Sequence, residues 1–310
     1  MRWVTYLSPE TGEQCPGLLN GTQVRGLGPR ESLLDLLESE GGLDAAAERA
    51  EQAPVEVAEL GNITLCAPIP RPPSIRDFLS FEEHLRNARQ ALGRPEIPPL
   101  WFEQPVFYFT NPAAVHGPDE TIAISPGSRS FDYEVEVAAV IGRAGGNLAP
   151  GEAEAHIAGY TVFCDWSARD VQAHESTIGL GPAKGKDSAT SIGPVLVTPD
   201  ELEPYRKGNG YQLAMRASVN GQDYGGGSWA DIYWSFGEML AYASRGTTLV
   251  PGDVIGSGTV GTGCILELSG LHGGERYPYL LPGDTVRVEI AELGAITGHI
   301  APSAPLIPIR

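Results

Sequence analysis

The chain has 310 residues, with 21 basic and 39 acidic side chains and a formal charge of −18. This charge repels phosphate backbones and excludes a general nucleic-acid binder, and no apolar run reaches the roughly 18–20 residues of a membrane-spanning helix. Hydrophobic residues make up 42% and charged residues 19%, which is typical of a globular protein with one large or two modest domains. The four cysteines are far apart and the start of the chain lacks an apolar signal segment, so we expect a cytoplasmic protein.

Residues 1–68 predict a small N-terminal α+β domain. A strand-like start is followed by a second strand that meets an Asn-Gly turn at Asn20–Gly21. The leucines of residues 33–37 recur at helical spacing, and a glycine pair then interrupts this helix. The proline cluster at 68–73 marks the boundary with a second domain, residues 69–310.

The second domain is expected to contain mostly strands around a few helices, which makes the whole chain a β-rich α+β protein. The segment 75–92 has apolar residues near helical spacing and predicts a helix of about five turns capped by Ser74. Two further helices are expected at 151–160 and 228–246. Apolar runs between turn signals predict strands at 105–109, 121–126, 133–142, 158–166, 191–199, 212–221, 248–259, 263–270 and 284–294.

The sharpest local feature is the pair Glu134 and Glu136 in one of these strands. Residues two apart on a strand share a face, about 6.6–7 Å from each other, so both carboxylates point the same way. Ala138 and Val140 continue that face, which indicates that it is covered. Two carboxylates in a covered site need a cation, and Mg²⁺, Mn²⁺ and Ca²⁺ prefer oxygen ligands. The alternative is an edge strand whose acidic face lies in water.

Two more acidic residues and a histidine extend this hypothesis. Asp165 ends an apolar strand and precedes a short predicted helix, where it could equally cap the helix. Asp77 lies seven residues before His84 in the predicted 75–92 helix, and a first-turn acid there could serve only the helix dipole. His84 could be a surface residue, although histidine is the natural general base near neutral pH.

Two glycine-rich segments resemble nucleotide-binding motifs only superficially. Residues 181–190 lack the glycine spacing of a phosphate-binding loop, and Asp187 stands where Ser or Thr would hold the metal. Residues 256–261 fit GxGxxG, but a predicted strand follows them, so we expect no helix N-terminus for a pyrophosphate. Neither segment is expected to bind a nucleotide.

Several segments, taken in chain order, resemble the fumarylacetoacetate hydrolase family, and more closely its bacterial members of similar length. The matching stretches cover roughly residues 70–310 and read RDFLSFEEH, DYEVEVAAVIG, AHIAGYTVFCDWSARDVQ, LGPAKGKDSATSIGPVLVTPDEL, GSGTVGTG and ILELSG. The resemblance implies a mixed β-roll catalytic domain, a divalent-metal site and a homodimer.

The resemblance also implies a role for each of a set of residues. Carried over by motif position, the implied metal ligands are Asp77, Glu134, Glu136 and Asp165. The implied water-activating base is His84, oriented by Glu267. The implied stabilisers of the oxyanion and the enolate are Lys186 and Gln172, and the implied substrate contacts are Tyr108 and Thr259. Thr190 is a weaker candidate for the surroundings of the metal. Arg169 is expected to be structural and paired with a neighbouring acid.

The chain also departs from the family pattern. Leu79 and Ser176 stand where the eukaryotic fumarylacetoacetate enzyme has tyrosines, which implies a substrate other than fumarylacetoacetate. Shorter acylpyruvase members pair their histidine with a glutamate three residues later, where this chain has Asn87. The partner of His84 therefore has to come from elsewhere, and Glu267 is the candidate.

The expected function is divalent-metal-dependent hydrolysis of a C–C bond in a β-diketone or acylpyruvate-type substrate, with Mg²⁺, Mn²⁺ or Ca²⁺ as cofactor. The alternative is a 2-keto acid decarboxylase, hydratase or tautomerase that acts on an oxaloacetate-like substrate at the same metal site. The presence of His84 favours hydrolysis, because decarboxylation can proceed with the metal alone. A third hypothesis is a metal-stabilised scaffold that has lost activity. The expected partner is a small keto acid or diketone.

Overall fold

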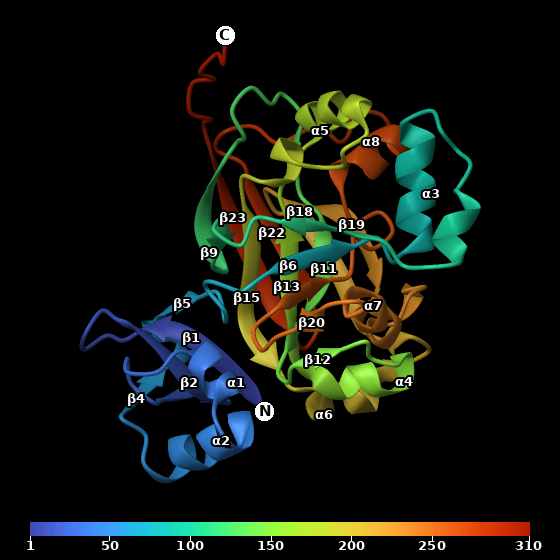
Figure 1. The fold of residues 1–310 in the computed structure, drawn as a ribbon. Helices are drawn as coiled ribbons and strands as arrows, with labels where there is room; N and C mark the ends of the chain where they lie inside the picture. Colours follow the sequence, from blue (N-terminus) through green and yellow to red (C-terminus); the bar gives the residue numbers. More distant parts are fainter.

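Two β-sheets dominate the computed structural model, which describes all of residues 1–310 (Figure 1). The twelve strands of the larger sheet are β1 (Arg2–Leu7), β2 (Gln14–Asn20), β3 (Gln23–Gly26), β4 (Glu56–Glu59), β5 (Thr64–Cys66), β6 (Ile75–Phe78), β7 (Phe107–Thr110), β8 (Val115–His116), β11 (Val135–Ile141), β13 (Ile157–Asp165), β15 (Thr190–Val197) and β21 (Val254–Gly256). The five strands of the smaller sheet are β9 (Asp119–Ala123), β18 (Ala214–Val219), β19 (Gln222–Ser228), β22 (Thr285–Ile290) and β23 (Gly294–Ala301). The β-rich α+β class expected from the sequence is confirmed.

Short strands and helices lie between the strands of the two sheets. The two-residue strands pair as β10 (Phe131–Asp132) with β14 (Ser167–Ala168), β12 (Gly145–Gly146) with β20 (Thr248–Leu249), and β16 (Arg206–Lys207) with β17 (Gly210–Tyr211). The α-helices are α1 (Leu33–Glu38), α2 (Gly42–Gln52), α3 (Glu82–Ala91), α4 (Pro150–Ala153), α5 (Arg169–Glu175), α6 (Pro199–Leu202), α7 (Phe236–Ala243) and α8 (Ile265–His272). The 3₁₀ turns are η1 (Leu60–Asn62), η2 (Pro99–Phe102), η3 (Glu154–His156), η4 (Ser176–Ile178), η5 (Lys184–Lys186), η6 (Glu203–Tyr205) and η7 (Trp229–Asp231). None of these helices has the length and apolar character needed to cross a membrane.

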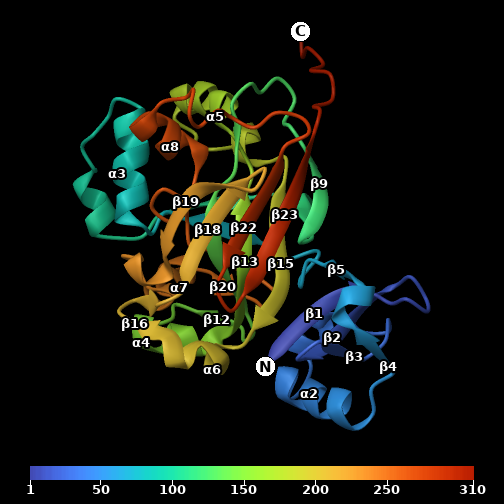
Figure 2. The same cartoon turned by 180° about the vertical axis from the view of Figure 1, so that it is seen from behind.

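The N-terminal elements β1 to β5, α1 and α2 lie at one end of the molecule (Figures 1 and 2). They do not form a separate sheet, because β1 pairs antiparallel with β15, with Trp3 opposite Leu196. Trp3 and the buried leucines of α1 share one apolar cluster with Ala138 and Val140 of β11. The first 68 residues therefore extend the large sheet, and the domain boundary at residue 68 stays a prediction.

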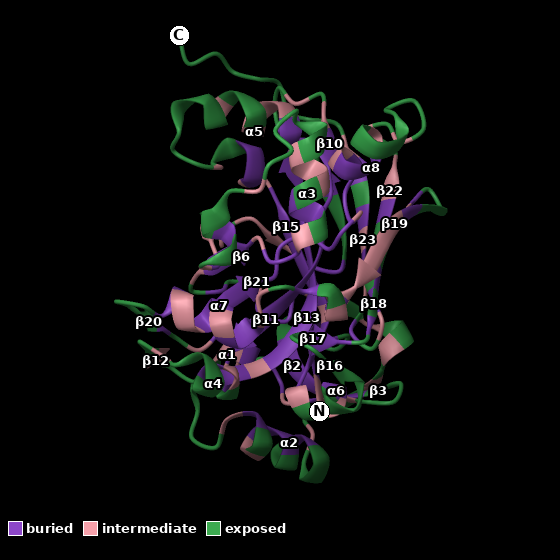
Figure 3. Ribbon diagram, turned by 90° about the vertical axis from the view of Figure 1, so that its right-hand side faces the viewer, coloured by how far each residue is buried: buried purple, intermediate pink, exposed green.

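The central strand β11 is buried along its whole length (Figure 3). It separates two apolar clusters. Val135, Val137, Ala139 and Ile141 belong to the core shared with the smaller sheet. Ala138 and Val140, on the opposite face, pack toward the N-terminal elements. Because β11 lies between β13 and β21, the edge-strand alternative for Glu134 and Glu136 is wrong.

The helix expected over residues 75–92 is wrong in its first half. Residues 75–78 form β6, which pairs with β21 and β7 and buries all four of its side chains. Ser74 is no helix cap, since its hydroxyl donates a 2.6 Å hydrogen bond to Asp253. The helix α3 begins only at Glu82. Pairing on both edges satisfies the backbone of β6 and overrides the local helical spacing.

The strand expected at 263–270 is also wrong, because these residues contain the helix α8. The carboxylate of Asp132 accepts hydrogen bonds from the backbone N–H groups of Ile265 (2.8 Å) and Leu266 (3.0 Å) and so satisfies the start of this helix. A helix therefore does follow the GxGxxG segment, contrary to our expectation. Its N-terminus is already occupied by Asp132, so a pyrophosphate still has no place there.

The two other expected helices are shorter than predicted. Residues 151–160 divide into α4, η3 and the start of β13. Residues 228–246 divide into η7 and α7, and Ser235 caps α7 through a hydrogen bond from the backbone of Glu238. In the first segment β13 replaces the end of the expected helix, and in the second the Ser235 cap places the start of α7 inside the expected helix.

Candidate active site

Four acidic side chains converge where neighbouring strands of the large sheet meet. Asp77 lies on β6, Glu136 on β11, Glu134 immediately before β11, and Asp165 at the end of β13. A carboxylate oxygen from each of the four lies within 4.8 Å of the others, and all four side chains are buried. Asp165 does not cap a helix, because the N-cap of α5 is Ala168.

Lys186 and Arg169 are the positive charges at this cluster. The ammonium group of Lys186 donates to Glu134 and, at 2.7 Å, to Asp165. The guanidinium of Arg169 lies 2.8 Å from both Glu134 and Asp132, as expected for an arginine paired with neighbouring acids. Burial alone would raise the pKa of Glu134, but Lys186 and Arg169 hold it well below its usual range.

The remaining carboxylates carry more negative charge than the protein compensates. Burial and the neighbouring Asp77 raise the pKa of Glu136 well above its ordinary value, and burial and Glu134 raise the pKa of Asp165 to about 8 even though Lys186 lowers it. Of the four negative charges, Lys186 offsets one, while Arg169 is shared with Asp132. The raised pKa values show that ionising all four carboxylates would leave uncompensated negative charge in a buried site, which a multivalent cation would offset.

The oxygen atoms of the cluster fit a divalent metal ion. The Oδ1 atoms of Asp77 and Asp165 are buried and have no hydrogen-bond partner. An orphaned carboxylate oxygen is costly unless a cation binds it, and hard cations such as Mg²⁺, Mn²⁺ and Ca²⁺ take oxygen ligands. The four residues predicted as metal ligands therefore form a candidate site for a divalent cation.

The GxGxxG segment supports these carboxylates. The backbone N–H of Gly258 donates to Glu136 at 2.9 Å, and Thr259 Oγ1 lies 3.4 Å from the other oxygen of Glu136. A Cβ atom on Gly256 would lie 2.6 Å from Oδ1 of Asp77, so a side chain there would displace a carboxylate of the cluster. The glycines bring backbone close to carboxylates instead of phosphates.

His84 and Glu267 form a second buried group, on α3 and α8. Nδ1 of His84 lies 2.8 Å from Oε2 of Glu267. The other carboxylate oxygen accepts from Asn87 Nδ2 at 3.1 Å and from the backbone N–H of Thr262 at 2.9 Å, and Cys264 Sγ lies 3.3 Å from Oε2. His84 is only 5% exposed, so the surface alternative for this residue is wrong.

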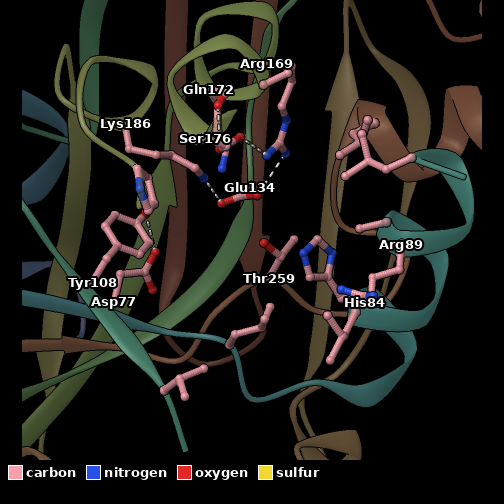
Figure 4. Close-up of a pocket in the computed structure, with 18 of the residues that line it drawn as sticks. Asp77, His84, Arg89, Tyr108, Glu134, Arg169, Gln172, Ser176, Lys186 and Thr259 are labelled. Atoms are coloured by element: carbon pink, nitrogen blue, oxygen red, sulfur yellow. Dashed lines mark hydrogen bonds and ion pairs between the residues drawn. The ribbon is translucent and has the colours of Figure 1, made fainter. Parts of the chain in front are cut away.

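Both groups open into one cavity of about 540 Å³. Figure 4 shows His84 across this cavity from Lys186, Tyr108 and Asp77, with Glu134 between them. Because Nδ1 of His84 faces Glu267, its other ring nitrogen is left for a bound molecule. The cavity is also lined by the predicted residues Gln172 and Thr259. Two of the three positions that depart from the family pattern, Leu79 and Ser176, line it as well.

Tyr108, like Lys186, contacts the acidic cluster directly. Its hydroxyl contacts Asp165 and lies 2.8 Å from Asp77. Gln172 accepts a 3.3 Å hydrogen bond from Arg169. Thr190 is buried opposite Asp165 in the pairing of β13 with β15 and does not line the cavity.

Three contacts of Glu267 were not predicted from the sequence. Asn87 was recognised only as a departure from the family pattern, whereas it donates to the carboxylate that replaces the missing glutamate. The backbone of Thr262 and the thiol of Cys264 also contact Glu267. The spacing of Asn87 one helical turn after His84 was the available signal for the first, since residues i and i+3 share a helix face.

The sheet, the acidic cluster and the histidine–glutamate pair together define a strand-rich enzyme fold with a candidate carboxylate site for a metal ion. The family model for the fumarylacetoacetate (FAA) hydrolase C-terminal domain matches residues 74–301. The chain therefore belongs to the fumarylacetoacetate hydrolase family, as its motifs indicated.

Similar proteins in this family differ in their reactions. The mitochondrial oxaloacetate tautomerase FAHD2A of Homo sapiens is 28% identical over 274 residues, which cover 87% of this chain and 80% of that protein. The oxaloacetate tautomerase YisK of Bacillus subtilis is 31% identical over 245 residues, 78% of this chain and 74% of that protein. The structure of the fumarylacetoacetate hydrolase from psychrophilic Exiguobacterium antarcticum has a TM-score of 0.73 and 25% identity over 97% of this chain and 99% of that one.

Proposed function

We propose that this protein is a divalent-metal-dependent enzyme that interconverts the keto and enol forms of an oxaloacetate-type 2-oxo acid. The observation that carries the proposal is the placement of the His84–Glu267 pair in one wall of a cavity that also holds the acidic cluster and Lys186. Tautomerisation needs a base for the proton on carbon and positive charge beside the oxygen that becomes negative. The similarity to two oxaloacetate tautomerases supports this choice of reaction.

Each residue has a role in this reaction that follows from its contacts. Glu267 holds the proton of His84 on Nδ1, which leaves Nε2 free to take a proton from the substrate carbon and to return it. Glu267 also stabilises the imidazolium that exists between the two transfers. The ammonium group of Lys186, fixed by Glu134 and Asp165, lies beside the position where negative charge develops on oxygen.

A divalent ion held by Asp77, Glu134, Glu136 and Asp165 would polarise the two substrate oxygens as a Lewis acid. Tyr108 and Thr259 border both the acidic cluster and the cavity, and they would orient the substrate. None of residues 1–68 lines the cavity, so we assign the chemistry to the predicted domain 69–310. The homodimer and the cytoplasmic location stay predictions.

The second candidate is the C–C hydrolysis of a β-diketone that we expected from the sequence. The volume of the cavity favours it, because about 540 Å³ suits a ligand considerably larger than a four-carbon acid. In this reaction Nε2 of His84 would take a proton from water, and the departing fragment would leave as an enolate beside Lys186. The same residues therefore serve both candidates.

The experiment that tests the proposal compares two substrates with Mg²⁺ or Mn²⁺ present. Decay of the enol absorbance of oxaloacetate measures tautomerisation, and loss of the diketone absorbance of acetylpyruvate measures hydrolysis. We expect faster enol decay that depends on the metal and on His84, with His116→Ala, a half-buried histidine outside the cavity, as the control. Turnover of acetylpyruvate alone would replace the first candidate by the second, and turnover of neither would refute both.

A further inference from the structure

Three side chains that can each bind a transition metal meet behind the proposed base. A ring nitrogen of His84, Sγ of Cys264 and a carboxylate oxygen of Glu267 lie within 4.8 Å of one another, and all three residues are buried. Imidazole, thiolate and carboxylate together are the ligands that Zn²⁺ prefers. We propose that these residues form a second metal site, separate from the four-carboxylate cluster, which takes Zn²⁺ and thereby inhibits the enzyme.

The carboxylate of Glu267 is already oriented for this site. Its Oε1 atom accepts from Asn87 Nδ2 and from the backbone N–H of Thr262. These two bonds turn Oε2 toward the other two ligands, at 2.8 Å from Nδ1 of His84 and 3.3 Å from Sγ of Cys264. Such outer hydrogen bonds fix a ligating carboxylate and strengthen metal binding.

Charge balance favours a dication at this position. Zn²⁺ with one thiolate, one carboxylate and one neutral imidazole is a neutral unit, which avoids the cost of a buried net charge. The ion has an approach from the cavity, because His84 lines its wall. The four-carboxylate cluster has only oxygen ligands and suits harder cations.

The proton balance explains why zinc would inhibit. Binding breaks the S–H bond of Cys264 and releases that proton to solvent, while the lone pair of the thiolate forms the bond to zinc. The neutral ring of His84 must also change tautomer: Nδ1 gives up its proton to solvent, its lone pair binds zinc, and Nε2 takes up one proton from solvent. Inhibition by zinc rests on the proposed function, because an Nε2 that holds a proton, on a ring bound to zinc through Nδ1, cannot act as the base.

Cobalt(II) provides a test of the site that does not depend on turnover. The protein is first saturated with Mg²⁺ to fill the four-carboxylate cluster and is then titrated with Co²⁺. We expect a thiolate-to-cobalt charge-transfer band in the near ultraviolet, which is lost in Cys264→Ser and in Cys264→Ala and kept in Cys66→Ser, a cysteine outside the cavity. Thermal unfolding checks that the variants are folded. Absence of the band in the natural protein, or its persistence in both Cys264 variants, would overturn the proposal.

Zinc inhibition then tests the consequence, with each variant compared with its own zinc-free rate at saturating Mn²⁺. Removing an outer-shell partner already costs about 10–100-fold in metal affinity, so losing the thiolate should raise the inhibitory zinc concentration at least about a hundredfold. Inhibition that excess Mn²⁺ relieves and that Cys264→Ser leaves unchanged would put zinc at the carboxylate cluster and refute the second site. If no 2-oxo acid is turned over, the proposed function fails, and the cobalt spectrum still decides the zinc site.

Discussion

Replacing Glu267 by glutamine tests the histidine–glutamate pair directly. The carboxylate accepts four hydrogen bonds, from His84, Cys264, Asn87 and the backbone of Thr262. An amide has one acceptor oxygen and presents an NH₂ group to the remaining donors. The substitution therefore removes the negative charge that stabilises the imidazolium and also turns two donors toward another donor.

The expected fall in rate follows from the loss of the hydrogen bond between His84 and the charged carboxylate of Glu267. A hydrogen bond to a charged group contributes about 1.5–3 kcal/mol, which corresponds to a fall in rate of about 10–150-fold at 25 °C. We expect this loss in kcat for enol decay of oxaloacetate, with the Mn²⁺ dissociation constant of the acidic cluster unchanged. Glu275→Gln, an exposed glutamate just beyond α8, is the matched control. A folded Glu267→Gln protein within twofold of the natural rate would refute the role of Glu267.

Three further predictions concern the metal, the base and stability. Glu136→Gln should weaken Mn²⁺ binding at least about a hundredfold in a calorimetric titration. The thermal unfolding temperature of the metal-free protein should not change, because burial keeps the pKa of Glu136 high and a neutral side chain already suits the metal-free site. His84→Ala should keep Mn²⁺ binding and slow enol decay by about 10²–10⁴-fold; an unchanged rate would assign the base elsewhere. Hydrogen bonds from Ser32 lower the pKa of Asp35 from its ordinary 3.8, so the folded state favours the ionised form. The stability advantage of the natural protein over Asp35→Asn should be complete above pH 3.8 and disappear as the pH falls through the lower folded value, as urea unfolding at several pH values would show.

The pair Glu134 and Glu136 shows what strand periodicity can predict. Alternation placed both carboxylates on one face with Ala138 and Val140, and the structure brings both into the acidic cluster. That inference needed only the period of a strand, because the continuing apolar residues showed that the face is covered. The approach of Asp77 and Asp165 depends on which strands are neighbours. Only the resemblance to a known family supplied this information.

The errors at β6 and α8 have a common physical reason. Residues 75–78 carry a helical apolar pattern but are held between two strands, and residues 265–272 look strand-like but begin at the carboxylate of Asp132. In both segments a partner more than 100 positions away in the chain decides the backbone conformation. Local propensity is worth less than 1 kcal/mol per residue and yields to such contacts.

Helix α8 matters to the proposed function because it supplies Glu267, the carboxylate that contacts His84 on the short helix α3. Ala91 packs so closely on α8 that a Cβ atom at Gly270 would lie 2.5 Å from the Ala91 methyl group. His84, Asn87 and Ala91 follow one face of α3, and all three meet α8 or its Glu267. The position of the base is therefore set by helix packing against α8, whereas the metal ligands are set by the sheet. A substitution in the contact between α3 and α8 should slow proton transfer without weakening the affinity for the metal ion.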